Sequence, residues 1–190
     1  MADYDISTVE LEDDRYEVVQ SLVRNKYAVR DSTGEVVLRG KQKLFKLKEQ
    51  FPFVDADGND AFTVKAGGVL DVAGNYAIVD AATGEEVVVL DEDYSLFAEN
   101  WTVRDPDTGA ALATITSKNK LLEVLRHFVG AAGLIPHKYE IADAEGDHVG
   151  SIDGKFSLKD AYTVTIDDAS DVPKEAVVAA ACVLDALEGS

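Results

Sequence analysis

The chain has 190 residues and a formal net charge of −18, with 36 Asp and Glu against 18 Lys and Arg. Hydrophobic residues make up 46% of the chain and charged residues 28%. These ordinary values exclude a disordered, collagen-like or multi-span membrane protein. The single cysteine, Cys182, excludes an internal disulfide framework and a cysteine-only zinc site. The length favours one domain of ordinary size or two small ones. We predict a single domain over residues 1–190.

The acidic residues are spread along the whole chain, and their mutual repulsion acts against the compact state. Concentrated salt screens that repulsion, because the Debye length falls to about 3 Å near 1 M ionic strength. The composition therefore predicts a salt-loving host such as a halophilic archaeon. The alternative is an acidic cytosolic protein.

The N-terminal residues Met1-Ala-Asp-Tyr-Asp5 contain neither a basic stretch nor an apolar run. They therefore do not resemble a secretory signal. No segment of the chain is expected to cross a membrane as a helix. We expect a cytoplasmic protein.

A repeat organises the chain: an aromatic residue is followed four positions later by Asp, and then by Gly after three or four more. The five copies are Tyr27…Asp31…Gly34, Phe51…Asp55…Gly58, Tyr76…Asp80…Gly84, Trp101…Asp105…Gly109 and Tyr139…Asp143…Gly146. Successive aromatic positions differ by 24, 25, 25 and 38 residues. A sixth start at Tyr162 lacks the glycine.

Each repeat is interpreted as a strand, a tight turn and a returning strand. The residues after each aromatic are rich in β-branched types, which favour strands. The Asp side chain can accept hydrogen bonds from the amides that follow it, and Gly supplies the positive φ of short hairpin loops. Five such turns give ten strands, and the runs Tyr16–Val23 and Tyr162–Ile166 raise the number to about twelve.

Residues 118–129 are predicted to form an amphipathic helix inserted between the fourth and fifth repeats. Their apolar residues follow helical spacing. Gly130, Gly133 and Pro136 then end the helix. This insertion explains the long interval of 38 residues.

A second helix is predicted at Pro173–Leu187, with Asp171 placed to cap it and Pro173 suited to its first turn. Nine consecutive residues, Ala176–Leu184, are apolar, so every side of the helix must be surrounded. The fourteen residues from Lys174 to Leu187 would span about 21 Å at about 1.5 Å per residue. This is too short for a bilayer core of about 30 Å, so we expect it to be buried in protein.

The predicted strands and the buried helix indicate one fold. Eight strands close into a barrel that side chains fill, whereas more strands leave an interior space. We therefore predict a mainly β protein, a closed antiparallel barrel of about twelve strands around the C-terminal helix. Closure also removes the sheet edges that promote aggregation.

The repeated Tyr-x-Ile/Val-x-Asp-x-x-Gly units resemble those of the LURP-one-related family, and the resemblance covers nearly the whole chain. Two further stretches are similar to the last segments of that family: Lys155-Phe-Ser-Leu-Lys-Asp-Ala-Tyr-Thr-Val164 and Val183-Leu-Asp-Ala186. The family fold is similar to the tubby C-terminal domain and to phospholipid scramblases. The resemblance implies a twelve-stranded barrel around a central helix, and a biochemical role that is poorly defined.

The resemblance transfers no catalytic motif to this chain, and no cofactor is expected. A proline-rich N-terminal arm and a cysteine cluster for acylation, which mark scramblases, are missing from the sequence. Tubby domains bind phosphoinositide head groups through basic residues, an analogy at the level of the fold. The preferred hypothesis is a non-enzymatic domain that binds an anionic lipid head group or a protein partner. A scramblase-like lipid transporter and an enzyme with a site at the barrel mouth are the alternatives.

Residues 24–48 hold eight of the 18 basic residues and only two acidic ones, a local charge of +6. The candidate site for an anionic ligand lies in its second half, at Arg39, Lys41, Lys43, Lys46 and Lys48. Alternation along a strand would place the first three of these on one face. A solvated strand face that offsets acids elsewhere is the other interpretation. Nucleic acid is not an expected partner, because salt weakens phosphate contacts.

Other motifs do not predict a metal or a catalytic site. The run Asp55-Ala-Asp-Gly-Asn-Asp60 has Asp at the sixth position and Ala66 at the twelfth, where a calcium loop needs Gly and Glu, so we expect a hairpin turn. The three histidines, His127, His137 and His148, lack metal-ligand spacing and an adjacent nucleophile. Asp153 and Asp160 are interpreted as turn residues. Cys182 is expected to be a small buried hydrophobe.

Overall fold

The computed structural model describes Tyr4 and residues 6–20, 27–40, 50–67, 75–95, 98–118, 138–155, 161–167 and 172–188. Within these residues the chain forms twelve strands and one helix. The elements are β1 (Arg15–Gln20), β2 (Tyr27–Arg30), β3 (Val36–Gly40), β4 (Phe51–Asp55), β5 (Asp60–Ala66), β6 (Asn75–Asp80), β7 (Glu86–Ser95), β8 (Ala98–Arg104), β9 (Ala111–Ser117), β10 (Lys138–Asp143), β11 (His148–Gly154), β12 (Ala161–Ile166) and α2 (Lys174–Glu188).

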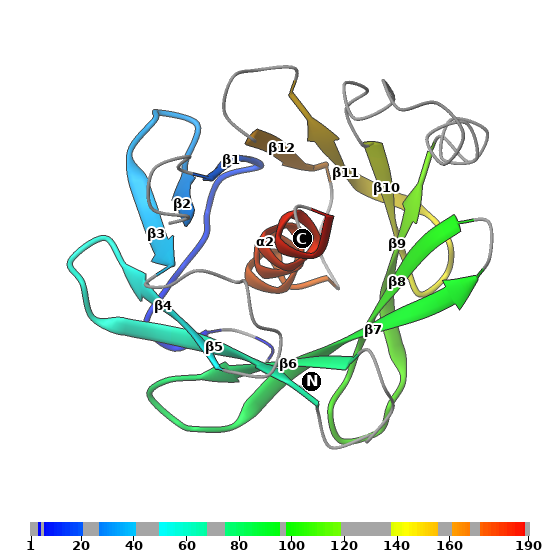
Figure 1. Cartoon of the computed structure of the whole chain (residues 1–190), viewed down its shortest axis with the longest axis horizontal. Helices are drawn as coiled ribbons and strands as arrows, with labels where there is room; N and C mark the ends of the chain where they lie inside the picture. The colour runs from blue at the N-terminus through cyan, green and yellow to red at the C-terminus, as the bar shows by residue number, and fades with distance from the viewer. Residues whose placement is uncertain are drawn as a thin grey trace.

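The strands form a closed antiparallel barrel around the helix (Figure 1). Each strand pairs with its neighbour in sequence, and β1 closes the ring by pairing with β12. The predicted fold class is thus confirmed. Residues 119–129 of the predicted amphipathic helix lie outside the described residues, as do residues 21–23 of the first predicted strand.

The five repeats form the five hairpins β2–β3, β4–β5, β6–β7, β8–β9 and β10–β11. Their glycines all have positive φ, from 71° to 94°. In every hairpin the register shifts between the second and third residues after the aromatic, for example between Val29 and Arg30. The repeat is therefore a structural unit that includes a β-bulge. Because the five turns follow alternate strands, they all lie at one end of the barrel, called here the turn end.

Hydrogen bonds that the Asp side chain accepts from backbone amides hold each turn, as the sequence predicts. In the first turn, Asp31 Oδ1 accepts from the amides of Thr33 at 3.0 Å and Glu35 at 2.8 Å. In the fourth, Asp105 Oδ1 accepts from the amides of Asp107 at 3.0 Å and Thr108 at 2.6 Å. Local sequence is sufficient to form these turns, since donor and acceptor lie within four residues of each other.

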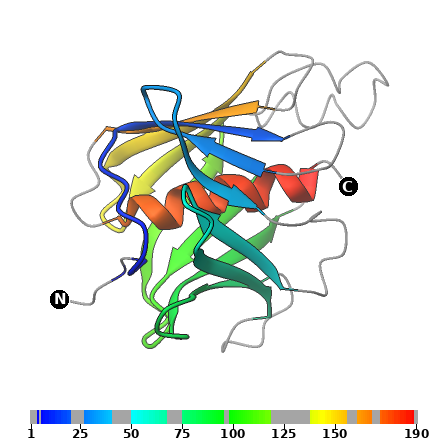
Figure 2. The same ribbon diagram turned by 90° about the vertical axis from the view of Figure 1, so that its left-hand side faces the viewer.

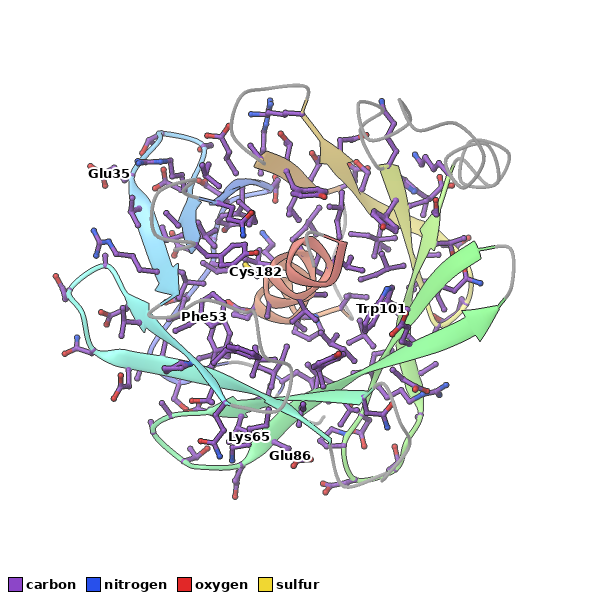
Figure 3. The ribbon with its side chains drawn as sticks, viewed as in Figure 1. Glu35, Phe53, Lys65, Glu86, Trp101 and Cys182 are labelled. Carbon is purple, nitrogen blue, oxygen red and sulfur yellow. The ribbon has the colours of Figure 1, made fainter. Side chains whose placement is uncertain are left out.

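The helix α2 runs along the barrel axis from the turn end to the opposite end, called here the far end (Figure 2). All nine residues of Ala176–Leu184 are buried, with exposed fractions of 0–3%. They share one apolar cluster with inward side chains of the strands, including Phe53 and Trp101 (Figure 3). The predicted burial of this helix is confirmed. No helix among the described residues has the length and hydropathy needed to span a bilayer.

Candidate functional site

Of the five predicted site residues, Arg39 lies in the described structure, and Lys41, Lys43, Lys46 and Lys48 lie outside the described residues. Arg39 is exposed on β3, as predicted for an outward position. Its Nη1 donates a 2.7 Å hydrogen bond to the carbonyl oxygen of Ala56, in the turn after β4. The guanidinium is therefore drawn toward the turn end.

The sequence segments that connect the strands at the two ends of the barrel differ in charge. The five tight turns, residues 31–35, 56–59, 81–85, 105–110 and 144–147, contain eight Asp and Glu and no Lys or Arg. The six sequence segments that connect strands at the far end are residues 21–26, 41–50, 67–74, 96–97, 118–137 and 155–160. They contain eleven Lys and Arg against four Asp and Glu. The predicted basic segment belongs to this pattern, because β3 ends and β4 begins at the far end.

Three described lysines mark the far end of the wall formed by β9, β10 and β11. Lys118 directly follows β9, Lys138 begins β10 and Lys155 directly follows β11. The backbone amide of Lys118 donates to the carbonyl of Lys138 at 2.7 Å, which joins the first two of these positions. Sequence reasoning missed this group, because its members are far apart in the chain.

Each of the three lysines pairs with a carboxylate on another strand. Lys118 Nζ lies 3.6 Å from Glu140 Oε1, and Lys138 Nζ lies 3.5 Å from Asp153 Oδ1. Lys155 pairs with Glu17 across β12. The lysine side chains are 38–53% exposed. Exposed ion pairs of this kind contribute only about 0–1 kcal/mol to stability, so an anionic ligand can compete with the carboxylates for these lysines.

Other sequence motifs have structural roles. Asp55 holds its turn, with Oδ1 accepting from the amides of Gly58 and Asn59, both at 2.8 Å. The Asn59 side chain donates to Oδ2 at 2.9 Å, and this contact is the main cause that lowers the pKa of Asp55. The interpretation as a hairpin turn is thus confirmed. No group of three or more potential metal ligands occurs in the described part of the chain.

The remaining candidates that lie in the described part of the chain do not form a catalytic group. His148 is exposed on β11, with its ring nitrogens 3.3 Å from Glu140 Oε1 and 3.1 Å from Asp167 Oδ2. His127, His137 and Asp160 lie outside the described residues. The interpretation of Asp153 as a turn residue is wrong, because β11 continues through it to Gly154. Cys182 is buried in α2, with an exposed fraction of 1%, as expected.

Comparison with known proteins gives a structural neighbour and a family. The X-ray structure of an Arabidopsis thaliana protein is similar, with a TM-score of 0.56 over 92% of this chain and 91% of that chain. The two sequences are 12% identical, so the likeness shows the fold alone. No curated protein matches the sequence significantly. The sequence model of the LURP-one-related family matches residues 36–185, from the third strand to the central helix. The chain therefore belongs to the LURP-one-related family.

Proposed function

We propose that this protein is a non-enzymatic binding domain that recognises anionic surfaces, phospholipid head groups in particular, with the far end of the barrel. The residues that would bind the head group are Lys41, Lys43, Lys46 and Lys48, together with the three lysines Lys118, Lys138 and Lys155. Arg39 is not included, because its guanidinium is hydrogen-bonded to the Ala56 carbonyl at the turn end. The observation that carries this proposal is the separation of charge between the two ends of the barrel.

A ligand at the far end would interact mainly with the basic residues near it, although the whole chain carries a net charge of −18. Between the two ends runs α2, whose 15 residues span about 22 Å at about 1.5 Å per residue. The Debye length at physiological ionic strength is about 8 Å, so salt largely screens the acidic end from a ligand at the far end. An anionic surface would therefore attract the far end and repel the turn end.

The interior of the barrel supports a role at the surface. Side chains of α2 and of the strands form one apolar cluster in this interior. Inside the barrel, the described helix residues 176–184 present only Ala, Val, Leu and Cys side chains to the wall. Of these residue types only Cys can act as a general acid or base, and residues 176–184 contain one, the buried Cys182.

Liposome flotation tests the proposal. The protein is mixed with vesicles of phosphatidylcholine alone, or of phosphatidylcholine with phosphatidylserine or a phosphoinositide, at salt concentrations from 50 mM to 1 M. We expect flotation with the anionic vesicles only, and a decrease as salt rises. The variant Lys41→Glu/Lys43→Glu should lose most of this binding, because each basic residue near an anionic surface contributes about 1 kcal/mol.

A matched control reverses two charges at the opposite end. The variant Arg15→Glu/Arg30→Glu has the same net charge as the Lys41→Glu/Lys43→Glu variant, but its changes lie at the turn ends of β1 and β2. It should float like the wild-type protein. Equal loss in both variants would mean that net charge alone governs binding, and unchanged flotation of the Lys41→Glu/Lys43→Glu variant would dismiss the basic segment as the site.

A further inference from the structure

The N-terminal residues before β1 close the turn end of the barrel. This strap, Tyr4 and residues 6–14, runs past the first turn of α2 and continues into β1 (Figure 2). Ile6 and Leu11 are buried, with exposed fractions of 2% and 5%, and both belong to the apolar cluster of the barrel. The strap therefore covers the end of the barrel where the helix begins.

The outer part of the strap, Tyr4 and residues 6–9, is held by two of the five turn aspartates. The Tyr4 hydroxyl donates to Asp105 Oδ2 at 2.7 Å. The amide and the hydroxyl of Ser7 both donate to Asp80 Oδ2, at 2.7 and 2.6 Å. In each case the other carboxylate oxygen holds the hairpin turn, so one side chain serves both the turn and the strap.

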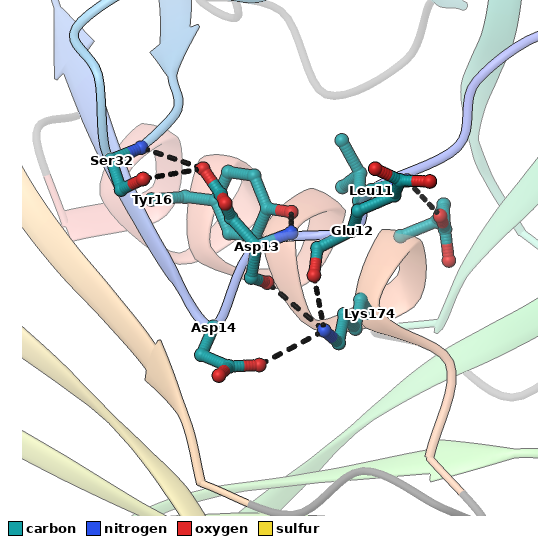
Figure 4. A network of polar contacts seen from close by, with 8 residues as sticks. Leu11, Glu12, Asp13, Asp14, Tyr16, Ser32 and Lys174 are labelled. Atoms are coloured by element: carbon teal, nitrogen blue, oxygen red, sulfur yellow. Dashed lines mark hydrogen bonds and ion pairs between the residues drawn. The ribbon is translucent and has the colours of Figure 1, made fainter.

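The inner part of the strap, residues 11–14, is attached to the helix. The amide of Leu11 donates to Glu175 Oε1 at 2.9 Å, and Glu175 is itself buried. Lys174 Nζ donates to the carbonyl oxygens of Glu12 and Asp13, at 3.0 and 3.1 Å, and to a carboxylate oxygen of Asp14 (Figure 4). These contacts fix the inner part to the first turn of α2.

We propose that the outer part of the strap is a lid, which opens about a hinge at Glu10 while the inner part and the barrel stay folded. Glu10 is exposed and lies between the two buried apolar residues Ile6 and Leu11. Opening breaks the contacts of Tyr4 and Ser7 and withdraws Ile6 from the apolar cluster. It uncovers the apolar mouth of the barrel at the turn end.

The two parts of the strap differ in the contacts that opening would break. The outer part has one fully buried apolar side chain, Ile6, and two partly buried ones, Tyr4 and Val9, and it pairs with no strand among the described residues. It contacts the backbone of β5 through the Thr8 hydroxyl, which donates to the carbonyl oxygen of Asp60 at 3.5 Å. The inner part leads into β1, where the carbonyl of Asp14 accepts from the amide of Ile166 at 2.8 Å. Segments with few buried contacts open locally, at a lower free energy than global unfolding.

Native-state hydrogen exchange on the full chain tests the lid. In the wild-type protein, amides of residues 6–10 should exchange at least about tenfold faster than the amides of β8, because the outer part of the strap opens while the barrel stays folded. The variant Tyr4→Phe/Ser7→Ala should accelerate exchange in residues 6–10 by about tenfold or more, because it removes two hydrogen bonds to carboxylates. Exchange in β8 and in α2 should stay unchanged.

Thr33→Ala serves as the matched control, because it removes a 2.8 Å hydroxyl bond to a turn aspartate, Asp31, that the outer strap does not contact. It should leave exchange in residues 6–10 unchanged. The proposal is wrong if residues 6–10 of the wild-type protein exchange as slowly as β8, or if the double variant accelerates both regions together. Should the double variant fail to fold, Tyr4→Phe alone and the wild-type comparison still decide the question.

Discussion

At the scale of single residues, the turn aspartates explain why the same sequence unit recurs. One carboxylate oxygen accepts hydrogen bonds from turn amides that would otherwise have no partner in the protein. This stabilises the turn wherever Asp and Gly keep their spacing. The sequence predicts this local role correctly in all five hairpins. It does not predict that Asp80 and Asp105 also bind the strap, because Ser7 and Tyr4 lie 73 and 101 residues away in the chain.

These aspartates should make the stability of the protein depend on pH. Burial tends to raise the pKa of Asp80, but hydrogen bonds from Ser7 and from turn amides outweigh it, and the pKa is lowered. The hydroxyl of Tyr4, followed by the Thr108 contacts, lowers the pKa of Asp105. When the pKa of a carboxyl is lower in the folded state than the unfolded value of about 3.9, the group stabilises the folded protein at pH values above this unfolded pKa. This stabilisation is lost as the pH falls below about 3.9 and through the folded-state pKa.

Urea unfolding between pH 7 and pH 2.5 measures this effect. The free energy of unfolding should fall below about pH 4, and the fall should be smaller in Asp80→Asn, which is less stable at pH 7 but has one titrating group fewer. Asp57→Asn, at an exposed position of the second turn, is the control and should follow the wild-type curve. An Asp80→Asn curve parallel to the wild-type curve would contradict the assigned pKa shift.

Two glycines should respond differently to the same substitution. A Cβ atom at Gly150 would lie 2.3 Å from the backbone oxygen of Thr165, on the paired strand β12. At Gly34 a Cβ atom would meet nothing within 4 Å, but φ is +89°. Gly150→Ala should therefore cost at least about 3 kcal/mol of unfolding free energy or prevent folding. Gly34→Ala should cost about 1–2 kcal/mol, the strain of a left-handed backbone. Equal losses in urea unfolding would refute the proposed close approach.

At the scale of elements, the composition of α2 fits its place inside the barrel. Four of the nine residues in Ala176–Leu184 are alanine, and all four are buried, with exposed fractions of 0–2%. Small side chains keep the helix narrow enough for large wall residues, such as Phe53 and Trp101, to pack around it. The sequence predicts the burial, since no side of the helix is polar.

Enlarging the helix should destabilise the barrel. Ala179 is fully buried, so Ala179→Leu forces side chains of the wall to move and should cost about 1–3 kcal/mol in urea unfolding. Ala111 is exposed at the start of β9, and Ala111→Leu should change stability by less than about 0.5 kcal/mol. A tolerated leucine at position 179 would mean that space remains between the helix and the wall.

At the scale of the whole molecule, repulsion among the acidic residues opposes folding, whereas closure of the barrel joins the edges of the sheet. The net charge of −18 opposes compactness, while pairing of β1 with β12 joins the two ends of the sheet. The salt-loving host and the wider kinship with tubby domains and scramblases stay predictions. The order of the strands assigns the connecting segments alternately to the two ends of the barrel, and the two sets of segments differ in charge in the sequence.

Salt should stabilise the protein. Between 0.1 and 2 M KCl the melting temperature at pH 7 should rise by several degrees, because screening weakens the repulsion among acids. The rise should shrink near pH 4.4, the isoelectric point of the sequence, where little net charge is left to screen. A melting temperature that stays constant or falls with KCl at pH 7 would show that charge repulsion does not limit stability.

The sequence by itself determined the hairpins and the burial of the terminal helix, because both depend on residues that are close together in the chain. Each hairpin turn depends on an Asp and the amides that follow it, and the burial of the helix depends on nine successive apolar residues. The tertiary structure alone decided which aspartates hold the strap, which lysines lie together at the far ends of β9, β10 and β11, and where the Arg39 guanidinium points. These arrangements depend on contacts across the closed ring, such as those between Tyr4 and Asp105 or Lys155 and Glu17. No local pattern encodes such contacts, because they form only when closure brings distant strands together.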